Sequence, residues 1–437
     1  MEHSGSIPAN PRPPARPLRT PSRSTVSLSE PANDGLPGFV AQIIGSIPAM
    51  SYGEERIRFL LDRLGHVDSN DRAQLRIFFN SLVSRMATVG ASDMDMGGES
   101  SNGHIWFRSD GDKKPGEGLP RLSTDESALV ILNLLGATAL ESLFSWRAAD
   151  FSHEIPGEPG ERRRRFRASA YMEMGNLALN MRSIQDSLFP LNSLGFHPAI
   201  ERGLMFSHER DGLTLVTGVT GSGKSSTLDA IVDANNADFH GHIVVVGKPI
   251  EYMHASKKCI VRHREVGQDV PSFKDGIVQA LRQDPDIVVI GEMRDPETIS
   301  SAIEITDSGH KVFSTLHTSS AVESIDRIVG EYPPNEQDRV RNRLADTLRC
   351  IISQKLAPKR GGGRVLAKEV LWVTPSARAA IKNDNSGEIY QMMWEGWGQG
   401  QITLEQDLFR LMRQGLITPE TAMSYANNKR RFMQLAK

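Results

Sequence analysis

The sequence predicts an α/β fold in which a mainly parallel sheet is covered by helices on both faces. Four short apolar segments, LTLVTG, HIVVVG, DIVVIGE and KVFSTLH, alternate with longer stretches of helical periodicity beyond Leu213. Such alternation is typical of parallel strands joined by crossover helices. A smaller α+β domain is expected before this region and a mostly helical part after it.

The first of these segments continues into a glycine-rich loop, LTLVTGVTGSGKSS, that matches the pattern GxxxxGK[ST]. Glycines 218, 221 and 223 allow the backbone to turn tightly and to aim its N–H groups at a phosphate. Lys224 adds a cation for the β and γ phosphates, and Ser225 is placed to bind Mg²⁺. A helix is expected from Ser226 to Ala234. The sequence therefore predicts a nucleoside triphosphate site made of Gly218, Thr220, Gly221, Ser222, Gly223, Lys224, Ser225 and Ser226.

Polar residues follow the other predicted strands, at the edge of the sheet where ligands bind in such folds. Glu292 closes DIVVIG and is our candidate for holding Mg²⁺ through water; its structural alternative is an ion pair with Arg294. Glu251, just after HIVVVG, could polarise the attacking water. His317, after KVFST, is a candidate γ-phosphate sensor, and His310 is a weaker one.

Arginine is expected to supply charge to the transition state, from the same or a neighbouring subunit. The candidates are Arg167 and Arg182 in the small domain and Arg282, Arg294 and Arg327 in the core. The run Arg162 to Arg165 has the weaker claim, because an arginine-rich hairpin tip is usually solvated.

The bulk composition narrows the class of partners. Among 437 residues, 51 Lys and Arg stand against 53 Asp and Glu, so nothing in the net charge of −2 favours nucleic acid. Cys259 and Cys350 form no CxxC pair and are interpreted as buried apolar side chains rather than zinc ligands. No segment approaches the roughly 20 apolar residues of a membrane span, so membrane contact is expected only through partners.

Five regions are expected along the chain. Residues 1–36 form a Pro-, Arg- and Ser-rich disordered arm, 37–72 a helical extension, and 73–203 the α+β domain. Residues 204–355 form the ATPase core and 356–437 the C-terminal, mostly helical subdomain. Within these, a single helix is expected from Ser123 to about Trp146, and helix is expected for most of the chain after Leu344, apart from a strand at Arg364 to Val373.

Together these motifs resemble the secretion-type ATPases, most closely the PilT-like retraction motors of type IV pili. The motifs are GASD, GVTGSGKS, PIEY, SKKCIVRHREVG, LRQDPDIVVIGEMRD, TDSGHKVFSTLHT and IDRIV. The resemblance implies a RecA-like P-loop core with a PAS-like N-terminal domain, assembled as a hexamer. It implies that Glu251 is the catalytic glutamate and Glu292 the Walker B glutamate. It also implies that His310 and His317 are the histidines of the family's His box. ATP and Mg²⁺ are then expected to bind between subunits, where the arginines act.

The resemblance further implies a cytoplasmic protein that reaches the inner membrane through a pilus or secretion platform protein. Two isolated cysteines cannot supply the four-cysteine zinc insertion of pilus-assembly and type II secretion relatives, which favours retraction. The helix near Arg378 occupies the place of a helix needed for retraction, but Ala379 and Ala380 depart from its pattern.

Gly247 and Lys248 stand where the family has an acidic pair, and Lys248 is expected to pair with Glu251 or a phosphate and to retune turnover. Two alternatives remain open: an ATPase of a conjugation or type IVB secretion system, and a nucleotide-binding regulator with weak hydrolysis. A third, a RecA-like nucleic-acid motor, is disfavoured by the acidic balance and by the absence of a groove that combines aromatic with basic residues.

Overall fold

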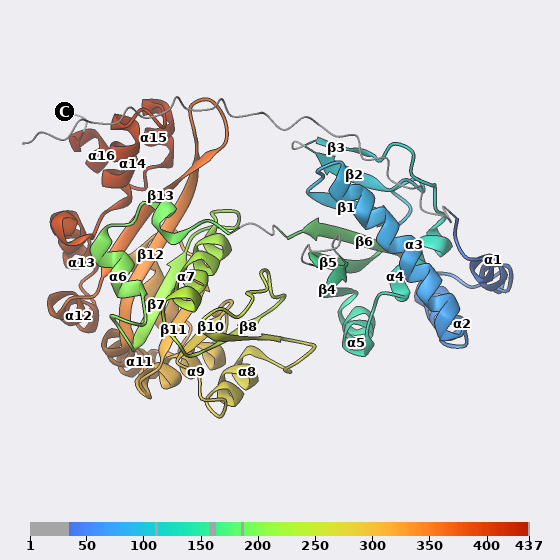
Figure 1. The fold of residues 1–437 in the computed structure, drawn as a ribbon, viewed down its shortest axis with the longest axis horizontal. Coiled ribbons are helices and arrows are strands. Elements are labelled where there is room, and N and C mark those ends of the chain that lie inside the picture. Colours follow the sequence, from blue (N-terminus) through green and yellow to red (C-terminus); the bar gives the residue numbers. More distant parts are fainter. Residues whose placement is uncertain (1–34, 110–111, 157–162, 185–187, 436–437) are drawn as a thin grey trace, which may run out of the picture.

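The computed structural model describes residues 35–109, 112–156, 163–184 and 188–435. The predicted disordered arm lies outside the described residues as far as residue 34, and so does Arg162. Figure 1 shows a smaller body formed by the N-terminal part of the chain beside a larger one formed by the rest.

The smaller body is built on a six-stranded antiparallel sheet with the order β3-β2-β1-β6-β5-β4. Its last three strands form a meander in which each strand pairs with the next, as the alternating pattern of the sequence predicts. The strands are β1 (Asp93–Gly97), β2 (Trp106–Ser109), β3 (Asp112–Pro115), β4 (Ala148–Ile155), β5 (Arg164–Glu173) and β6 (Asn176–Ser183).

Helices pack on this sheet, and one expectation about them is wrong. The single helix expected from Ser123 to Trp146 is two helices that are separated by residues 133–136. Gly136, a poor helix former, has an extended conformation and is the N-cap of the second helix, so the helical pattern starts again there. The helices are α1 (Gly38–Gly45), α2 (Gly53–Gly65), α3 (Ser69–Thr88), α4 (Thr124–Leu132) and α5 (Ala137–Trp146).

The N-terminal helices share one hydrophobic core with the sheet. Ile57 and Leu60 of α2 belong to the same buried cluster as Phe79 of α3, Leu129 of α4 and Met181 of β6. The boundary expected at residue 73 therefore lies inside a continuous core. We propose that residues 35–184 form one folding unit, because burial in a shared core stabilises its helices and strands together.

The larger body contains a seven-stranded sheet with the order β13-β12-β7-β11-β10-β8-β9. All neighbours are parallel except β12 and β13, which confirms the predicted α/β fold with a mainly parallel sheet. The strands are β7 (Gly212–Thr217), β8 (His242–Gly247), β9 (Ile260–Glu265), β10 (Ile287–Ile290), β11 (Lys311–Leu316), β12 (Leu348–Pro358) and β13 (Arg364–Trp372).

Helices cover both faces of this sheet. One face packs against the 3₁₀ helix η1 (Leu191–Leu194) and against α6 (Pro198–Leu204) and α7 (Lys224–Asp238). The other face packs against α8 (Phe273–Ala280), α9 (Pro296–Asp307), α10 (Ala321–Gly330), α11 (Pro334–Thr347), α12 (Pro375–Lys382) and α13 (Ser386–Glu395). Because apolar residues of the central strands are buried on both faces, their sequences read as continuous apolar runs.

The C-terminal part shares strands β12 and β13 with the same sheet. Strand β12 contradicts the expectation of helix in this segment after Leu344, and the boundary expected at residue 355 falls within it. Ala357 of β12 and Ala367 of β13 form a separate small core with the last helices. The helices of this core are α14 (Leu404–Arg413), α15 (Pro419–Tyr425) and α16 (Lys429–Leu435), and the 3₁₀ helix η2 (Gly396–Gln399) precedes them in the chain. None of the helices in the described ranges combines the length and apolar character that crossing a bilayer requires.

Candidate nucleotide site

The glycine-rich loop joins buried strand β7 to helix α7 at the carboxyl edge of the parallel sheet. Gly221 and Gly223 have φ values of 79° and 87°, a region that side chains with a Cβ rarely adopt. A Cβ on Gly218 would lie 2.3 Å from Ser222 Oγ and 2.5 Å from the carbonyl oxygen of Gln354. The loop therefore requires glycine, both for its backbone conformation and for its close packing.

Helix α7 begins at Lys224, two residues before the predicted start, so its N-terminal N–H groups face the loop. The Lys224 ammonium is buried and donates to the carbonyl oxygens of Gly218, at 2.8 Å, and Val219, at 3.2 Å. Burial lowers the pKa of Lys224, whereas the negative charges of Glu292 and Glu251 raise it. Both predicted carboxylates thus act electrostatically on the loop lysine.

Residues at the ends of β10 and β11 meet beside the loop. Lys224 Nζ lies 3.4 Å from His317 Nδ1, and His317 Nε2 lies 3.2 Å from Glu292 Oε1. Burial and the Lys224 charge lower the pKa of His317, so its ring is neutral at pH 7. The lysine therefore donates to Nδ1, and Nε2–H donates to the carboxylate. The structure brings together three residues that the sequence predicts.

Glu292 also forms the ion pair with Arg294 that the sequence offered as its structural alternative. Arg294 Nε lies 2.5 Å from Glu292 Oε1, and the arginine side chain remains 71% exposed. Its hydrogen bond with Glu292 raises the pKa of Arg294. Glu292 thus contacts both His317, on the side of the loop, and Arg294. Because the Arg294 side chain is exposed, its guanidinium is accessible to a phosphate or to a neighbouring subunit.

Glu251 follows β8 on an extended segment and is exposed. Within the described ranges, Lys248 forms no ion pair with Glu251, so the expected pairing of these two side chains is absent here. The second part of that expectation, contact between Lys248 and a phosphate, stays a prediction.

The remaining residues of the predicted loop differ in accessibility. Thr220 is exposed, Ser225 and Ser226 are half-buried, and Ser222 is buried. The carbonyl oxygen of Ser222 accepts from Gln354 Nε2 at 2.9 Å. Gln354 lies on β12 and was missed by the sequence analysis, because that segment was expected to be helical. The sequence offers little signal for this residue, because β12 mixes polar with apolar residues around it.

The other predicted arginines lie apart from this cluster. Arg182 of β6 pairs with Asp93 at 2.7 Å and is 66% exposed, and Arg327 of α10 pairs with Glu331 at 2.8 Å and is 64% exposed. Arg167 and Arg282 are exposed. Among the described residues, Arg294 is the one arginine that pairs with Glu292.

The structure differs from the expectations for two individual residues, His310 and Arg165. His310 lies before β11, with Nδ1 2.9 Å from Ser308 Oγ, and His317 follows the same strand. Because six strand residues span about 20 Å, His310 cannot act beside the nucleotide in the same subunit. Arg165 is not solvated at a hairpin tip but is buried, with 7% of its surface exposed.

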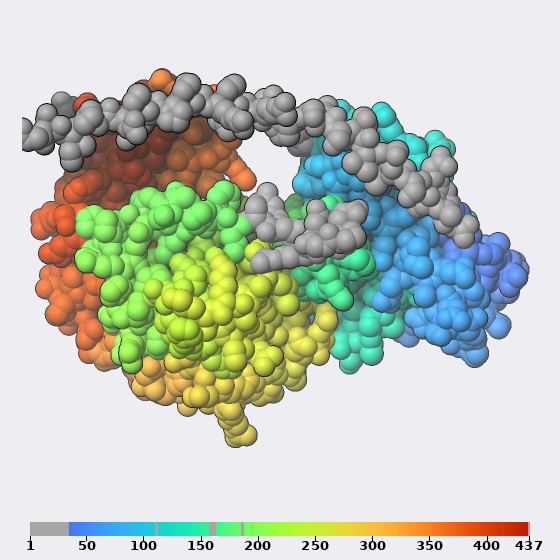
Figure 2. All heavy atoms as spheres, viewed as in Figure 1, coloured from blue at the N-terminus to red at the C-terminus, as the bar shows by residue number. Residues whose placement is uncertain are grey.

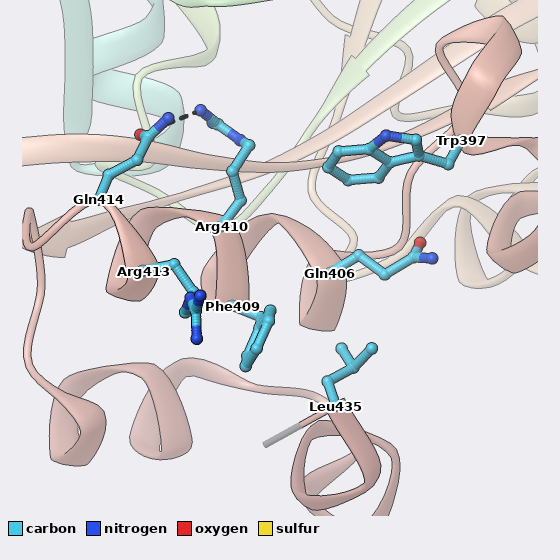
Figure 3. A pocket seen from close by; sticks show the side chains of 7 residues that line it. All are labelled: Trp397, Gln406, Phe409, Arg410, Arg413, Gln414 and Leu435. Atoms are coloured by element: carbon cyan, nitrogen blue, oxygen red, sulfur yellow. Dashed lines mark hydrogen bonds between the residues drawn. The ribbon is translucent and has the colours of Figure 1, made fainter. Parts of the chain in front are cut away.

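Both cysteines are buried, as predicted, and burial raises the pKa of Cys259 to about 11 and that of Cys350 to about 12. The described parts of the chain contain no cluster of three or more His, Cys, Asp or Glu side chains suited to a metal. A shallow pocket in the C-terminal part, drawn in Figure 3, contains none of the predicted site residues. It is lined by Trp397, Gln406, Phe409, Arg410, Arg413, Gln414 and Leu435.

Comparison with known proteins assigns the chain to a family. The family described as type II/IV secretion system protein matches residues 158–417, more than half of the chain. The chain belongs to this family. The matched residues include the P-loop, Glu251, Glu292 and His317, the residues that converge in the site.

Among members of the secretion ATPase family, the chain is PilT-like. It is 38% identical over 346 residues to the type IV pilus retraction ATPase PilT of Pseudomonas aeruginosa, a match that covers 79% of this chain and 97% of that protein. A twitching motility protein of Neisseria gonorrhoeae is 37% identical over 311 residues, covering 71% of this chain and 81% of that protein.

Solved structures support the same assignment. A crystal structure of the pilus retraction motor PilT with bound ADP matches with a TM-score of 0.71 and 36% identity, covering 81% of this chain and 98% of that one. The ATPase DotB of Legionella pneumophila matches with a TM-score of 0.69 and 26% identity, covering 80% and 94% of the two chains. The fold is therefore that of these secretion ATPases, in agreement with the predicted RecA-like core.

Proposed function

We propose that the chain is an ATP-hydrolysing motor subunit that powers type IV pilus retraction. The observation that carries this proposal is the line of contacts from Lys224 through His317 to Glu292 across the end of the sheet. This line joins the phosphate-binding loop after β7 to an acid at the end of β10, across the intervening strand β11, as hydrolysis of a triphosphate requires. The PilT relatives, which are named for pilus retraction, support the retraction role.

The geometry supports a specific division of work. The loop glycines and the N-terminus of α7 cradle the phosphates, and Lys224, now bonded to loop carbonyls, turns to the β and γ phosphates. Glu251 accepts a proton from the water whose oxygen attacks the γ phosphorus, while the bond to the β–γ bridging oxygen breaks. ADP and phosphate leave, and Arg294 compensates the charge that develops on the γ phosphoryl group.

Oxygen atoms of Ser225 and Glu292 fit a hard divalent cation such as Mg²⁺. Ser225 is half-buried at the start of α7, and 18% of the Glu292 side chain is exposed at the facing strand end. Ser225 would bind the ion directly and Glu292 through water. When bound, the ion would neutralise phosphate charge.

We further propose that the motor is a homo-hexamer in which exposed arginines reach the nucleotide of the next subunit. Arg182 and Arg327 are accessible for that role. The motor would act at the cytoplasmic face of the inner membrane through a platform protein, without inserting and without binding nucleic acid.

One alternative has its own support. The similarity to DotB favours an ATPase of a type IVB secretion or conjugation system, which would share the same site. The other alternative, a regulator with weak hydrolysis, follows from Lys248 at a position near Glu251, where the family carries an acid.

Phosphate release measured with malachite green tests the proposal. We expect ATP-dependent release by the wild-type protein and a loss of at least about 100-fold in Glu292→Gln, because the carboxylate that organises the metal is gone. Glu304→Gln, an exposed acid of α9, serves as the matched control and should retain full activity. Wild-type release no higher than that of Glu292→Gln would remove the enzyme and leave the regulator.

A further inference from the structure

A buried ion pair joins the N-terminal body to the ATPase core. Arg165, on β5 of the N-terminal sheet, places Nη2 2.8 Å from Oε2 of Glu265, at the end of core strand β9. Only 8% of each side chain is exposed. Figure 2 shows the two bodies in contact. Because desolvating two charges is costly, such a pair is maintained only with close geometry and further hydrogen bonds.

Further contacts are present on both sides, as a second ion pair of the arginine and as hydrogen bonds to the glutamate. Arg165 Nε lies 2.8 Å from Oε1 of Glu154 on the neighbouring strand β4. The Oε1 atom of Glu265 accepts from Ser152 Oγ at 2.8 Å and from Gln268 Nε2 at 2.8 Å. Strand β4 therefore contributes to the same contact, and the interface is a network rather than a single bridge.

Both members of the pair also hold the backbone of one core residue, Ile250. The backbone N–H of Ile250 donates to Glu265 Oε2 at 3.2 Å, and its carbonyl oxygen accepts from Arg165 Nη1. Ile250 immediately precedes Glu251. Arg165 of the N-terminal body and Glu265 of the core thus fix the backbone next to Glu251, the residue proposed to activate the water.

The far end of the same segment is fixed to the core alone. The backbone N–H of His254 donates to His263 Nε2 at 3.0 Å, and His254 Nε2 lies 3.1 Å from Oδ1 of Asp229 on α7. The carbonyl oxygen of Ala255 accepts from Asn236 Nδ2 at 2.8 Å. Glu251 therefore lies between an anchor within the core and a clamp that requires the N-terminal body.

We propose that Arg165 and Glu265 form a positioning clamp that makes the placement of Glu251 depend on the position of the N-terminal body. The inference rests on the proposed role of Glu251 in ATP hydrolysis. When the two bodies separate or rotate, Ile250 loses the Arg165 contact and Glu251 loses its fixed geometry. The clamp converts domain movement into control of the chemical step, since small displacements of a catalytic group lower the rate steeply.

The test compares Arg165→Gln, Arg165→Lys and the double variant Arg165→Gln/Glu265→Gln with the wild type. We expect kcat to fall at least about tenfold in Arg165→Gln, while the affinity for ADP changes less than about twofold. The kcat of Arg165→Lys should lie between those of the wild type and Arg165→Gln, because an ammonium cannot bond two acceptors in the geometry of a guanidinium. The double variant leaves no unpaired buried charge, so it should fold yet keep the low kcat.

Arg163→Gln is the matched control, because Arg163 is 78% exposed and contacts Glu154 only at 3.5 Å. It should retain wild-type kcat. Hydrogen exchange provides the second readout: the backbone amides of residues 250–253 should exchange faster in Arg165→Gln than in the wild type, and at the wild-type rate in the control. A wild-type kcat in both Arg165→Gln and the double variant would overturn the clamp, as would unaltered exchange at these residues. If the wild type hydrolyses no ATP, the proposed function fails, and exchange alone decides whether the clamp holds Ile250.

Discussion

At the scale of single residues, the two histidines of one motif show how position in a strand decides function. His310 and His317 lie at opposite ends of β11, and only His317 contacts Lys224 and Glu292. The sequence suggested both as candidates and ranked His317 first, because His317 follows the predicted strand whereas His310 precedes it. The parallel sheet decides, since its carboxyl edge carries the phosphate loop.

His317→Ala should lower kcat for ATP about 10- to 100-fold, because Lys224 and Glu292 lose the neutral ring that orients them. Nucleotide affinity should change little, since the loop itself is intact. Steady-state phosphate release and ADP binding would measure the two effects. His310→Ala is the control in the same strand and should keep wild-type kcat; equal losses in both variants would contradict the assigned geometry.

His263 predicts a pH dependence of stability. Burial, with the nearby His254 and Arg165, lowers the pKa of His263 from 6.5 to about 4. The folded state therefore favours the neutral ring, and its stabilising contribution is present above pH 6.5 and is lost as the pH falls from 6.5 towards 4. At about 1.4 kcal/mol for each pKa unit, the contribution is on the order of 3 kcal/mol.

The variant His263→Gln keeps an acceptor for the His254 N–H but does not titrate. Its melting temperature should fall less than that of the wild type between pH 7.5 and pH 5, as measured by differential scanning fluorimetry. His153, whose pKa burial likewise lowers to about 4, titrates in both proteins and sets the common background. Parallel curves for the two proteins would show that His263 gains its proton freely in the folded state.

At the scale of elements, the phosphate loop was predictable because its constraints are local. Gly218→Ala should reduce nucleotide affinity by at least about tenfold, since the added Cβ meets Ser222 Oγ and the Gln354 carbonyl. Titration with a fluorescent ADP analogue would measure this. Gly330→Ala in α10, where a Cβ meets no atom within 4 Å, is the control and should bind normally. Full affinity in Gly218→Ala would mean that the loop relaxes freely.

Strand β12 was not predictable in the same way. Its sequence, LRCIISQKLAP, mixes polar with apolar residues, and its Gln354 is only 1% exposed. It pairs with β7, more than 130 residues earlier in the chain, and with β13. Such non-local pairing buries polar side chains that a local pattern assigns to the surface. The contact between Gln354 and the P-loop followed from tertiary structure alone.

At the scale of the whole molecule, catalysis in a ring predicts complementation between inactive subunits. Glu292→Gln lacks the core acid, and Arg182→Ala lacks an exposed arginine of the N-terminal body. If Arg182 acts on the next subunit's nucleotide, mixed rings should recover up to about a quarter of wild-type hydrolysis, because a quarter of random interfaces combine both intact groups.

Co-expression of the two variants, isolation by two tags and a phosphate assay would measure this recovery. Co-expression of Glu292→Gln with Lys224→Ala is the control. Lys224 and Glu292 belong to the same core, so neither variant subunit has an intact core and hydrolysis should stay absent. Light scattering with and without ATP should show a hexamer. A monomer under all conditions, or no recovery in mixed rings, would exclude a role for Arg182 between subunits.

By itself the sequence determined the α/β class, the phosphate loop and the acids at the strand ends, because each depends on residues close together in the chain. Only the tertiary structure decided that His317 contacts both Lys224 and Glu292, that Arg165 is buried, and that Glu265 and Arg165 hold Ile250. Arg165 and Glu265 are 100 residues apart, and each alone reads as a surface charge. Charges enter an interior only where a partner compensates their desolvation, and that partner is chosen by the packing of two bodies rather than by local sequence.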